Sequence, residues 1–279
     1  MTEVRERELI VDGLRTVLAE AGPADADEAV VFVHGNPGSA RDWQDLMGRT
    51  GEFARSLAMD MPCFGRADKP RDFALPVEGH AHFLTSALND LGVKHAHLVL
   101  HDFGGPWGLG WAGLNQDAFA SVVLIDTGIL IGFEQHPTGK LWARPVVGEL
   151  VMAATTRGAF TRALLRGDAR PLPRAYIDQM YDTYDRATRR TVLRLYRNRT
   201  DDDVLRAASQ LFNGLDRPAL VLWGAKDPFV PLHHAEQQRE SFPRAEVVVL
   251  EDSGHWPFAD DPEGTANAVV PFVRGQLDE

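Results

Sequence analysis

The sequence predicts an α/β protein with a mostly parallel sheet of eight strands, flanked by helices and carrying a helical insertion after the sixth strand. Short apolar, β-branched runs recur along the chain, each followed by a Gly-rich or polar turn. Stretches with helical spacing separate them, and this alternation stops between about 128 and 214. Apolar strands that alternate with helices indicate a parallel sheet covered on both faces.

The first two strands are expected to form a hairpin. Glu8–Val11 and Leu14–Leu18 flank Asp12-Gly13, a dipeptide that favours a two-residue hairpin turn. The next expected strands are Ala29–Val33, Leu57–Met61, His97–Leu100, Val122–Ile125, Ala219–Leu222 and Glu246–Leu250. Helical spacing marks His80–Leu91 and Trp107–Asn115 between them.

Residues 128–214 contain no convincing strand, and prolines 137, 145, 171 and 173 interrupt them. Their helix-like stretches are Leu141–Ala154, Arg174–Asp182 and Arg186–Arg197. A helical segment inserted between strands is typical of a lid over the carboxyl ends of a sheet, where open α/β sheets bind ligands. We therefore expect a core domain of residues 1–127 and 215–279, and a helical lid of residues 128–214.

Composition restricts the class of protein. Cys63 is the single cysteine, so no internal disulfide forms and a reducing cytoplasm is the expected location. The charged start MTEVRERELI is unlike an export signal, and no apolar run approaches the ~20 residues that span a bilayer. A formal charge of −11 argues against a nucleic-acid surface.

Asp102 stands where an apolar strand runs into Gly104-Gly105 and a helical pattern. This setting is typical of a nucleophile elbow, a sharp turn that lifts one side chain above the sheet. An Asp between strand and helix would also serve as a helix N-cap. His34-Gly35-Asn36-Pro37 follows an earlier strand, so the N–H groups of Asn36 and Phe103 are expected to form an oxyanion hole.

Two further candidates follow later strands. Asp227 lies in WGAKDPF and His255 in DSGHWP, which gives the chain order nucleophile, acid, histidine. A histidine placed there together with both partners predicts a catalytic triad. Asp126, at the end of the strand after Asp102, is the alternative acid. Asp227 is preferred because the family resemblance given below implies that an acid after Trp-Gly is the more usual arrangement.

The segments HGNPGSARDW, DMPCFGRADKP, HDFGGPWG, WGAKDPF and DSGHWP resemble the α/β-hydrolase superfamily, within it the branch of epoxide hydrolases and haloalkane dehalogenases. The resemblance covers nearly the whole chain apart from the lid, and it implies the α/β-hydrolase fold. It implies that Asp102 attacks an electrophilic carbon to form an alkyl ester. His255 would then activate a water that hydrolyses this ester, and no cofactor or metal is expected.

The leaving group remains open between two activities. Halide release needs N–H donors beside the nucleophile; Asn36 resembles one, but Phe103 donates no hydrogen bond. Epoxide opening needs a proton donor, and Tyr196 in LYRN resembles a lid tyrosine of epoxide hydrolases, with His136 or Trp142 as a second donor. We expect an epoxide hydrolase, with a haloalkane dehalogenase as the alternative and a non-catalytic binding member as a third reading.

The expected substrate is small and apolar, water is the second reactant, and the protein is expected to be a monomer or homodimer that binds neither nucleic acid nor membrane. Its pocket is expected to be lined by largely aromatic and aliphatic side chains. These are His34, Trp107, Ile129, Phe133, His136, Trp142, Phe229 and Trp256.

Overall fold

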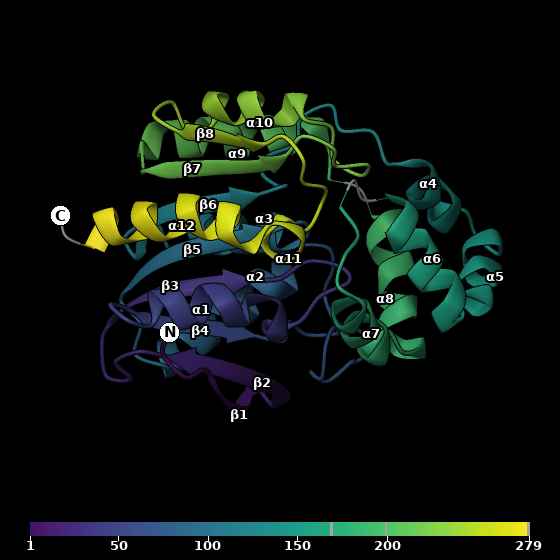
Figure 1. Ribbon diagram of the computed structural model, residues 1–279, viewed down its shortest axis with the longest axis horizontal. Helices are drawn as coiled ribbons and strands as arrows, with labels where there is room; N and C mark the ends of the chain where they lie inside the picture. The colour runs from purple at the N-terminus through teal and green to yellow at the C-terminus, as the bar shows by residue number, and fades with distance from the viewer. Residues whose placement is uncertain (168–169, 199, 278–279) are drawn as a thin grey trace.

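A single sheet of eight strands forms the centre of the molecule in the computed structural model, which describes residues 1–167, 170–198 and 200–277 (Figure 1). The strand order is β1-β2-β4-β3-β5-β6-β7-β8. β1 and β2 are antiparallel to their neighbours, and the other neighbours are parallel. The strands are β1 (Arg5–Val11), β2 (Leu14–Ala21), β3 (Glu28–Val33), β4 (Arg55–Met59), β5 (His95–His101), β6 (Phe119–Ile125), β7 (Ala219–Gly224) and β8 (Glu246–Leu250). The predicted fold is confirmed.

The opening hairpin turns at the dipeptide expected from the sequence. Asp12 and Gly13 have φ angles of 49° and 78°, and Val11 pairs with Leu14 across the turn. Positive φ at both central residues matches the right-handed twist of the flanking strands, which is why Asp-Gly favours this turn. The Leu57–Met61 strand lies two residues earlier, as β4.

Helices cover both faces of the sheet. In Figure 1, α1 and α12 lie in front of the sheet, whereas α2 and α3 lie side by side behind it. Strands buried between two helical layers need apolar side chains on both faces, and every residue of β4 and β7 is buried. The helices around the sheet are η1 (Ala40–Trp43), α1 (Gln44–Thr50), α2 (Glu78–Asp90), α3 (Gly104–Leu114), α9 (Asp202–Leu215), α10 (His233–Gln237), η2 (Gln238–Glu240), α11 (Pro257–Asp260) and α12 (Pro262–Leu277).

Among the described residues, five helices between β6 and α9 form a separate layer beyond the carboxyl ends of the strands (Figure 1). They are α4 (Pro137–Ala143), α5 (Val147–Ala154), α6 (Arg157–Gly167), α7 (Arg174–Thr183) and α8 (Arg186–Arg197), called the α4–α8 insertion below. The stretch predicted as one helix over Leu141–Ala154 is two helices, because the chain turns at Pro145-Val146, where Val146 has a φ of 68°. The sequence did not predict α6.

α9 falls within the 128–214 range expected for the lid, yet it contacts the helices that flank the sheet. It contacts α3 and η2, and Phe212 packs edge to face on Phe119 of β6 with ring centroids 5.9 Å apart. The separate helical layer is thus α4–α8, which ends before α9 begins.

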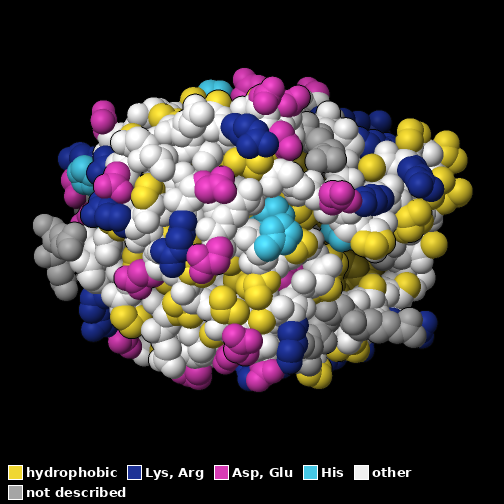
Figure 2. Space-filling model, turned by 90° about the horizontal axis from the view of Figure 1, so that it is seen from above, with side chains coloured by type: hydrophobic (Ala, Val, Ile, Leu, Met, Phe, Trp, Pro, Cys, Tyr) yellow, Lys and Arg dark blue, Asp and Glu magenta, His cyan; other side chains and the backbone are white. Residues whose placement is uncertain are grey.

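The outer end of the α4–α8 insertion exposes apolar side chains. Figure 2 shows hydrophobic side chains gathered there beside Lys and Arg, at the end of the molecule where α5 lies in Figure 1. The exposed ones in this part of the chain are Leu141, Val146, Val147, Leu150 and Leu165. Within the described ranges, no helix is both long and apolar enough to cross a membrane.

Candidate active site

Asp102 occupies a sharp turn between β5 and α3. Its φ is 50°, in the left-handed region that non-glycine residues seldom adopt, and α3 begins two residues later at Gly104. The Asp102 carbonyl accepts the hydroxyl of Thr127 at 2.6 Å and the N–H of Gly105 at 3.0 Å. These bonds hold the turn in the shape predicted for an elbow.

Three glycines let the chain pass close to this turn. A Cβ atom at Gly35 would overlap the Asp102 side chain, and one at Gly104 would overlap the carbonyl oxygen of Val33. A Cβ at Gly105 would overlap Thr127. The small residues around Asp102 are therefore required by the close approach of β3, β5 and the start of α3.

The loop after β3 aims a backbone donor at Asp102. The N–H of Asn36 donates to Asp102 Oδ1 at 2.7 Å. The side-chain oxygen Oδ1 of Asn36 is buried and has no hydrogen-bond partner among the described residues. One carboxylate oxygen of Asp102 is thus held by a backbone donor, while Oδ2 faces His255.

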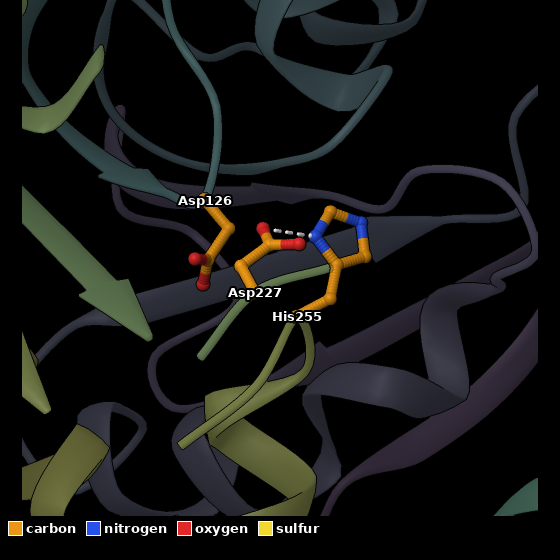
Figure 3. A group of neighbouring side chains, drawn as sticks. All are labelled: Asp126, Asp227 and His255. Carbon is orange, nitrogen blue, oxygen red and sulfur yellow. Dashed lines mark hydrogen bonds and ion pairs between the residues drawn. The ribbon is translucent and has the colours of Figure 1, made fainter. Parts of the chain in front are cut away.

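His255 lies between two carboxylates. Its Nε2 is 3.5 Å from Asp102 Oδ2, and its Nδ1 donates to Asp227 Oδ2 at 2.7 Å (Figure 3). Asp227 Oδ1 accepts the N–H groups of Phe229 and Val230 at 2.6 and 3.0 Å, so its carboxylate is fixed in place. The three side chains therefore stand in the hydrogen-bonding order of a triad, with Asp227 as the acid beside His255.

Asp126 lies on the other side of Asp227. Figure 3 shows Asp227 between Asp126 and His255. Asp126 Oδ1 accepts the N–H of Gly224 at 2.9 Å, and no bond joins this residue to His255. The alternative acid is therefore close to the triad, but Asp227 holds the position that orients the imidazole.

The charges of these groups stabilise one another. Burial alone would lower the pKa of His255, but the charges of Asp227 and Asp102 and hydrogen bonds to both raise it well above its usual value. Burial would also raise the pKa of Asp102, yet the hydrogen bond and charge of His255 hold it below its usual value. Asp102 is therefore an anion at neutral pH.

Tyr196, from α8, and His136, from the N-cap of α4, face this group from the α4–α8 insertion. The Tyr196 hydroxyl lies 3.0 Å from His136 Nε2, and its ring meets that of Phe103 edge to face at 5.7 Å. His136 Nδ1 accepts the N–H of Gly139 at 3.1 Å. Burial, reinforced by the charge of Asp102, raises the pKa of Tyr196 well above its usual value, so its hydroxyl stays protonated.

Aromatic rings surround the triad and the Tyr196–His136 pair. Phe229 packs on the rings of His255, Trp256 and His136 with centroids 5.1 to 5.7 Å apart. Trp142 meets Tyr196 edge to face at 4.9 Å, and its buried indole N–H has no partner among the described residues. These predicted pocket residues lie together beside the triad.

Ile129 and Phe133 lie on the chain that leads from β6 into the insertion. Ile129 is buried, and Gln238 holds both its N–H and its carbonyl. Phe133 packs edge to face on His234 of α10, with centroids 6.0 Å apart. Their role as pocket walls stays a prediction.

The polar atoms of two predicted pocket residues are bonded to backbone, and their role as pocket walls stays a prediction. His34 is fully buried, and its Nε2 accepts the N–H of Met61 at 2.9 Å while Nδ1 donates to the Gly35 carbonyl at 2.8 Å. Trp107 is fully buried, stacked on His80, with its indole N–H bonded to the Pro76 carbonyl at 3.0 Å. Both side chains hold the loops around the site in place, because their polar atoms bond to the backbone of Met61 and Pro76.

Sequence reasoning missed two supporting residues. His101 stacks against His255 with ring centroids 4.7 Å apart, and its Nε2 donates to the His255 carbonyl at 2.7 Å. Burial lowers the pKa of His101 to about 3, so it stays neutral. Thr127 fixes the elbow from the end of β6. His101 directly precedes Asp102, and Thr127 directly follows Asp126. These positions were the signals in the sequence that could have identified them.

Comparison with known proteins places these features in a family. Residues 28–262 match the model of the alpha/beta hydrolase fold family. A cis-3-alkyl-4-alkyloxetan-2-one decarboxylase from Xanthomonas campestris is 27% identical, with 95% of this chain and 93% of that protein covered. A haloalkane dehalogenase from Agrobacterium fabrum is 32% identical over 97 residues, which is 35% of this chain and 32% of that one.

Solved structures share the same fold. The haloalkane dehalogenase DatA from Agrobacterium tumefaciens C58 superposes with a TM-score of 0.83 at 22% identity, covering 97% of each chain. The 2-hydroxy-6-oxo-6-phenylhexa-2,4-dienoate hydrolase from a Rhodococcus strain gives 0.83 at 19% identity, covering 100% of each chain. The match to the family model spans strands β3 to β8 and all members of the predicted triad. The chain belongs to the alpha/beta hydrolase fold family.

Proposed function

We propose that this protein is a hydrolase with Asp102 as nucleophile, and that it opens an apolar epoxide to a diol. The observation that carries the epoxide assignment is the Tyr196–His136 hydrogen bond facing Asp102 from the α4–α8 insertion. We further propose that this insertion acts as a lid, because it brings those two side chains over the carboxyl ends of the strands.

The hydrogen bonds of His136 determine which of its two ring nitrogens carries the proton. Gly139 N–H donates to Nδ1, so Nδ1 carries no hydrogen. Burial lowers the pKa of His136, so the ring is neutral and its proton is on Nε2. Nε2 therefore donates to the Tyr196 oxygen, which leaves the Tyr196 O–H free to donate to a substrate oxygen.

The first step of the proposed reaction is an alkylation. Asp102 Oδ2 attacks a ring carbon, the carbon–oxygen bond breaks, and the Tyr196 O–H gives its proton to the departing oxygen. The product is an ester of Asp102 whose other carbon carries a hydroxyl. A hydroxyl donor lowers this barrier because an alkoxide is a poor leaving group.

The second step is hydrolysis of that ester. His255 takes a proton from water, and the hydroxide attacks the Asp102 carbonyl carbon, with Asn36 N–H beside the oxygen that becomes negative. Asp227 stabilises the imidazolium. Collapse releases the diol and restores Asp102, and the proton held by His255 returns to Tyr196. The sum is epoxide plus water giving diol.

A haloalkane dehalogenase is the second candidate. It is favoured by the likeness to haloalkane dehalogenases and by the indole N–H of Trp142, which is buried without a partner among the described residues. A departing halide needs such donors. Phe103 leaves the position beside Asp102 without one, which is why this activity ranks second.

Intact-mass spectrometry of a His255→Gln variant tests both. Removing the base blocks hydrolysis and leaves alkylation intact, so styrene oxide should add its own mass to the protein, on the peptide that contains Asp102. 1-Bromobutane and an alkyl-substituted oxetan-2-one are run in parallel, the latter because of the Xanthomonas relative. Asp102→Asn is the matched control and should show no adduct.

Each outcome has a distinct meaning. An adduct with bromobutane and none with styrene oxide would reverse the order of the two activities. An adduct with the oxetanone alone would move the proposal to a strained cyclic ester. No adduct with any probe, together with ligand binding that Asp102→Asn leaves unchanged, would favour a non-catalytic member of the family.

A further inference from the structure

Asp126 is a buried carboxyl group that the proposed reaction does not use. Its side chain is inaccessible to solvent, and its φ of 47° places it at a sharp turn where β6 ends. Oδ1 accepts the N–H of Gly224, but Oδ2 has no hydrogen-bond partner among the described residues. A buried polar atom without a partner is uncommon and needs a physical explanation.

The explanation lies in its neighbours. One ligand atom each from Asp126, Asp227 and His255 lie within 4.8 Å of one another, and in Figure 3 the Asp126 carboxyl sits next to that of Asp227. Two buried carboxylates this close cannot both be ionised without a large cost. One proton must therefore be held between them.

The proton belongs on Asp126. Asp227 already accepts His255 Nδ1–H and two backbone N–H groups, which stabilise its anion, whereas Asp126 accepts only one. Burial, followed by the charge of Asp227, raises the pKa of Asp126 well above its usual value. His255 Nδ1 and both oxygens of Asp227 already make hydrogen bonds, so they are not available as metal ligands. A proton therefore suits this cluster better than a metal ion.

We propose that Asp126 is a positioning residue: a neutral carboxylic acid that donates its hydroxyl to Asp227 and so limits the negative charge Asp227 presents to His255. The inference rests on the proposed role of His255 as the base. Asp126 touches no substrate and acts only through Asp227.

The consequence concerns the ester intermediate. The groups that face His255 are Asp227, Asp102, neutral His101 and neutral His136. Once Asp102 is an ester it is uncharged, and Asp227 becomes the main anion that raises the pKa of His255. A hydrogen-bond donor at position 126 weakens that anion and lowers the pKa of His255, so the imidazole is neutral and able to accept a proton from water.

Nitrogen NMR titration of His255 tests this without any substrate. The full chain carries Asp102→Asn, which has the uncharged state of the ester. Into this background are placed Asp126→Ala, which removes the donor, and Asp126→Asn, which keeps a donor and an acceptor for Gly224. We expect D126A to raise the pH at which His255 titrates by about one unit, and D126N to stay within a few tenths.

A D126A variant that titrates like its parent, or a D126N variant that shifts as far as D126A, overturns the proposal. Infrared difference spectroscopy at neutral pH gives a second test that does not depend on D126A folding. A protonated carboxyl band present in the wild type should vanish in D126N, and its absence from the wild type would also overturn the proposal. Because neither measurement uses turnover, both remain valid if the epoxide assignment fails.

Discussion

Tyr196 differs in its surroundings from the other three tyrosines of the chain. Its hydroxyl accepts from His136 near Asp102, whereas the Tyr184 hydroxyl donates to the sulfur of Met152, at 3.5 Å. Tyr196→Phe should therefore lower kcat/KM for an epoxide by about 10²- to 10³-fold, the effect of losing one donor to a developing oxyanion. Steady-state diol formation from styrene oxide measures it.

Tyr184→Phe is the matched control, since it removes a hydroxyl from the same layer of helices away from Asp102, and it should retain full turnover. Tyr196→Phe should leave bromide release from 1-bromobutane unaffected, because a halide needs no proton. A Tyr196→Phe variant with unchanged epoxide turnover would remove the main support for the epoxide assignment.

Single residues differ in how far the sequence could place them. The Trp-Gly context favours Asp227 over Asp126, and the structure places Asp227 beside His255. The sequence could not show that His34 and Trp107 bond to backbone, because an aromatic or imidazole side chain looks the same there whether or not its polar atom is bonded. His34 accepts from Met61, 27 residues away in sequence, and Trp107 donates to Pro76, 31 residues away. Bonds over such separations become visible in the structure alone.

The turn between β5 and α3 depends on glycine at position 104. A Cβ there would meet the backbone oxygens of Val33 and His34, which cannot move without shifting β3. Gly104→Ala should lower the free energy of unfolding by about 1–3 kcal/mol, the usual cost of overpacking. Urea unfolding followed by circular dichroism measures the change.

Gly214→Ala is the control at this scale. It lies in α9 with no atom near the added Cβ, so it should be neutral or raise stability by up to about 1 kcal/mol. Equal effects of the two substitutions would show that the elbow tolerates a side chain at position 104.

Strands and helices could be predicted from the sequence where the pattern of apolar residues is continuous. The apolar runs of β3, β5, β6 and β7 are nearly continuous, so the sequence placed these strands to within three residues. Within the α4–α8 insertion, α7 and α8 were predicted to within one residue, whereas the turn at Pro145-Val146 was not foreseen. α6 was missed, and α9 resembles its neighbours in sequence although it packs against the sheet side.

At the scale of the whole molecule, charge is divided between two parts. Residues 128–200 carry 13 Lys and Arg against 6 Asp and Glu, a formal charge of +7, whereas the rest of the chain carries −18. One ion pair between the two parts follows this division, Arg170 with Asp261 at 3.2 Å, and another reverses it. Lys69 pairs with Asp185 at 3.2 Å, and Arg194 of α8 donates to the carbonyls of Arg71 and Phe73, both at 2.8 Å.

Cys63, the single cysteine, lies under this junction and reports on its opening. Its side chain is fully buried, its carbonyl accepts the Thr188 hydroxyl of α8 at 3.3 Å, and burial raises the pKa of its thiol. Labelling by a thiol reagent therefore requires local opening that separates α8 from the core. Arg194→Ala removes two charge-assisted hydrogen bonds, about 1.5–3 kcal/mol each, so labelling should accelerate at least tenfold.

Arg186→Ala, at an exposed arginine of the same helix, should label at the wild-type rate. The rate is followed by absorbance of the released thiolate in excess reagent, well below the unfolding midpoint. If α8 instead stays docked and Cys63 is reached only by global unfolding, Arg194→Ala would speed labelling no more than it speeds unfolding. Faster labelling at an unchanged unfolding rate would mean that the α4–α8 insertion moves as a unit on a stable core, as substrate entry beneath a lid requires.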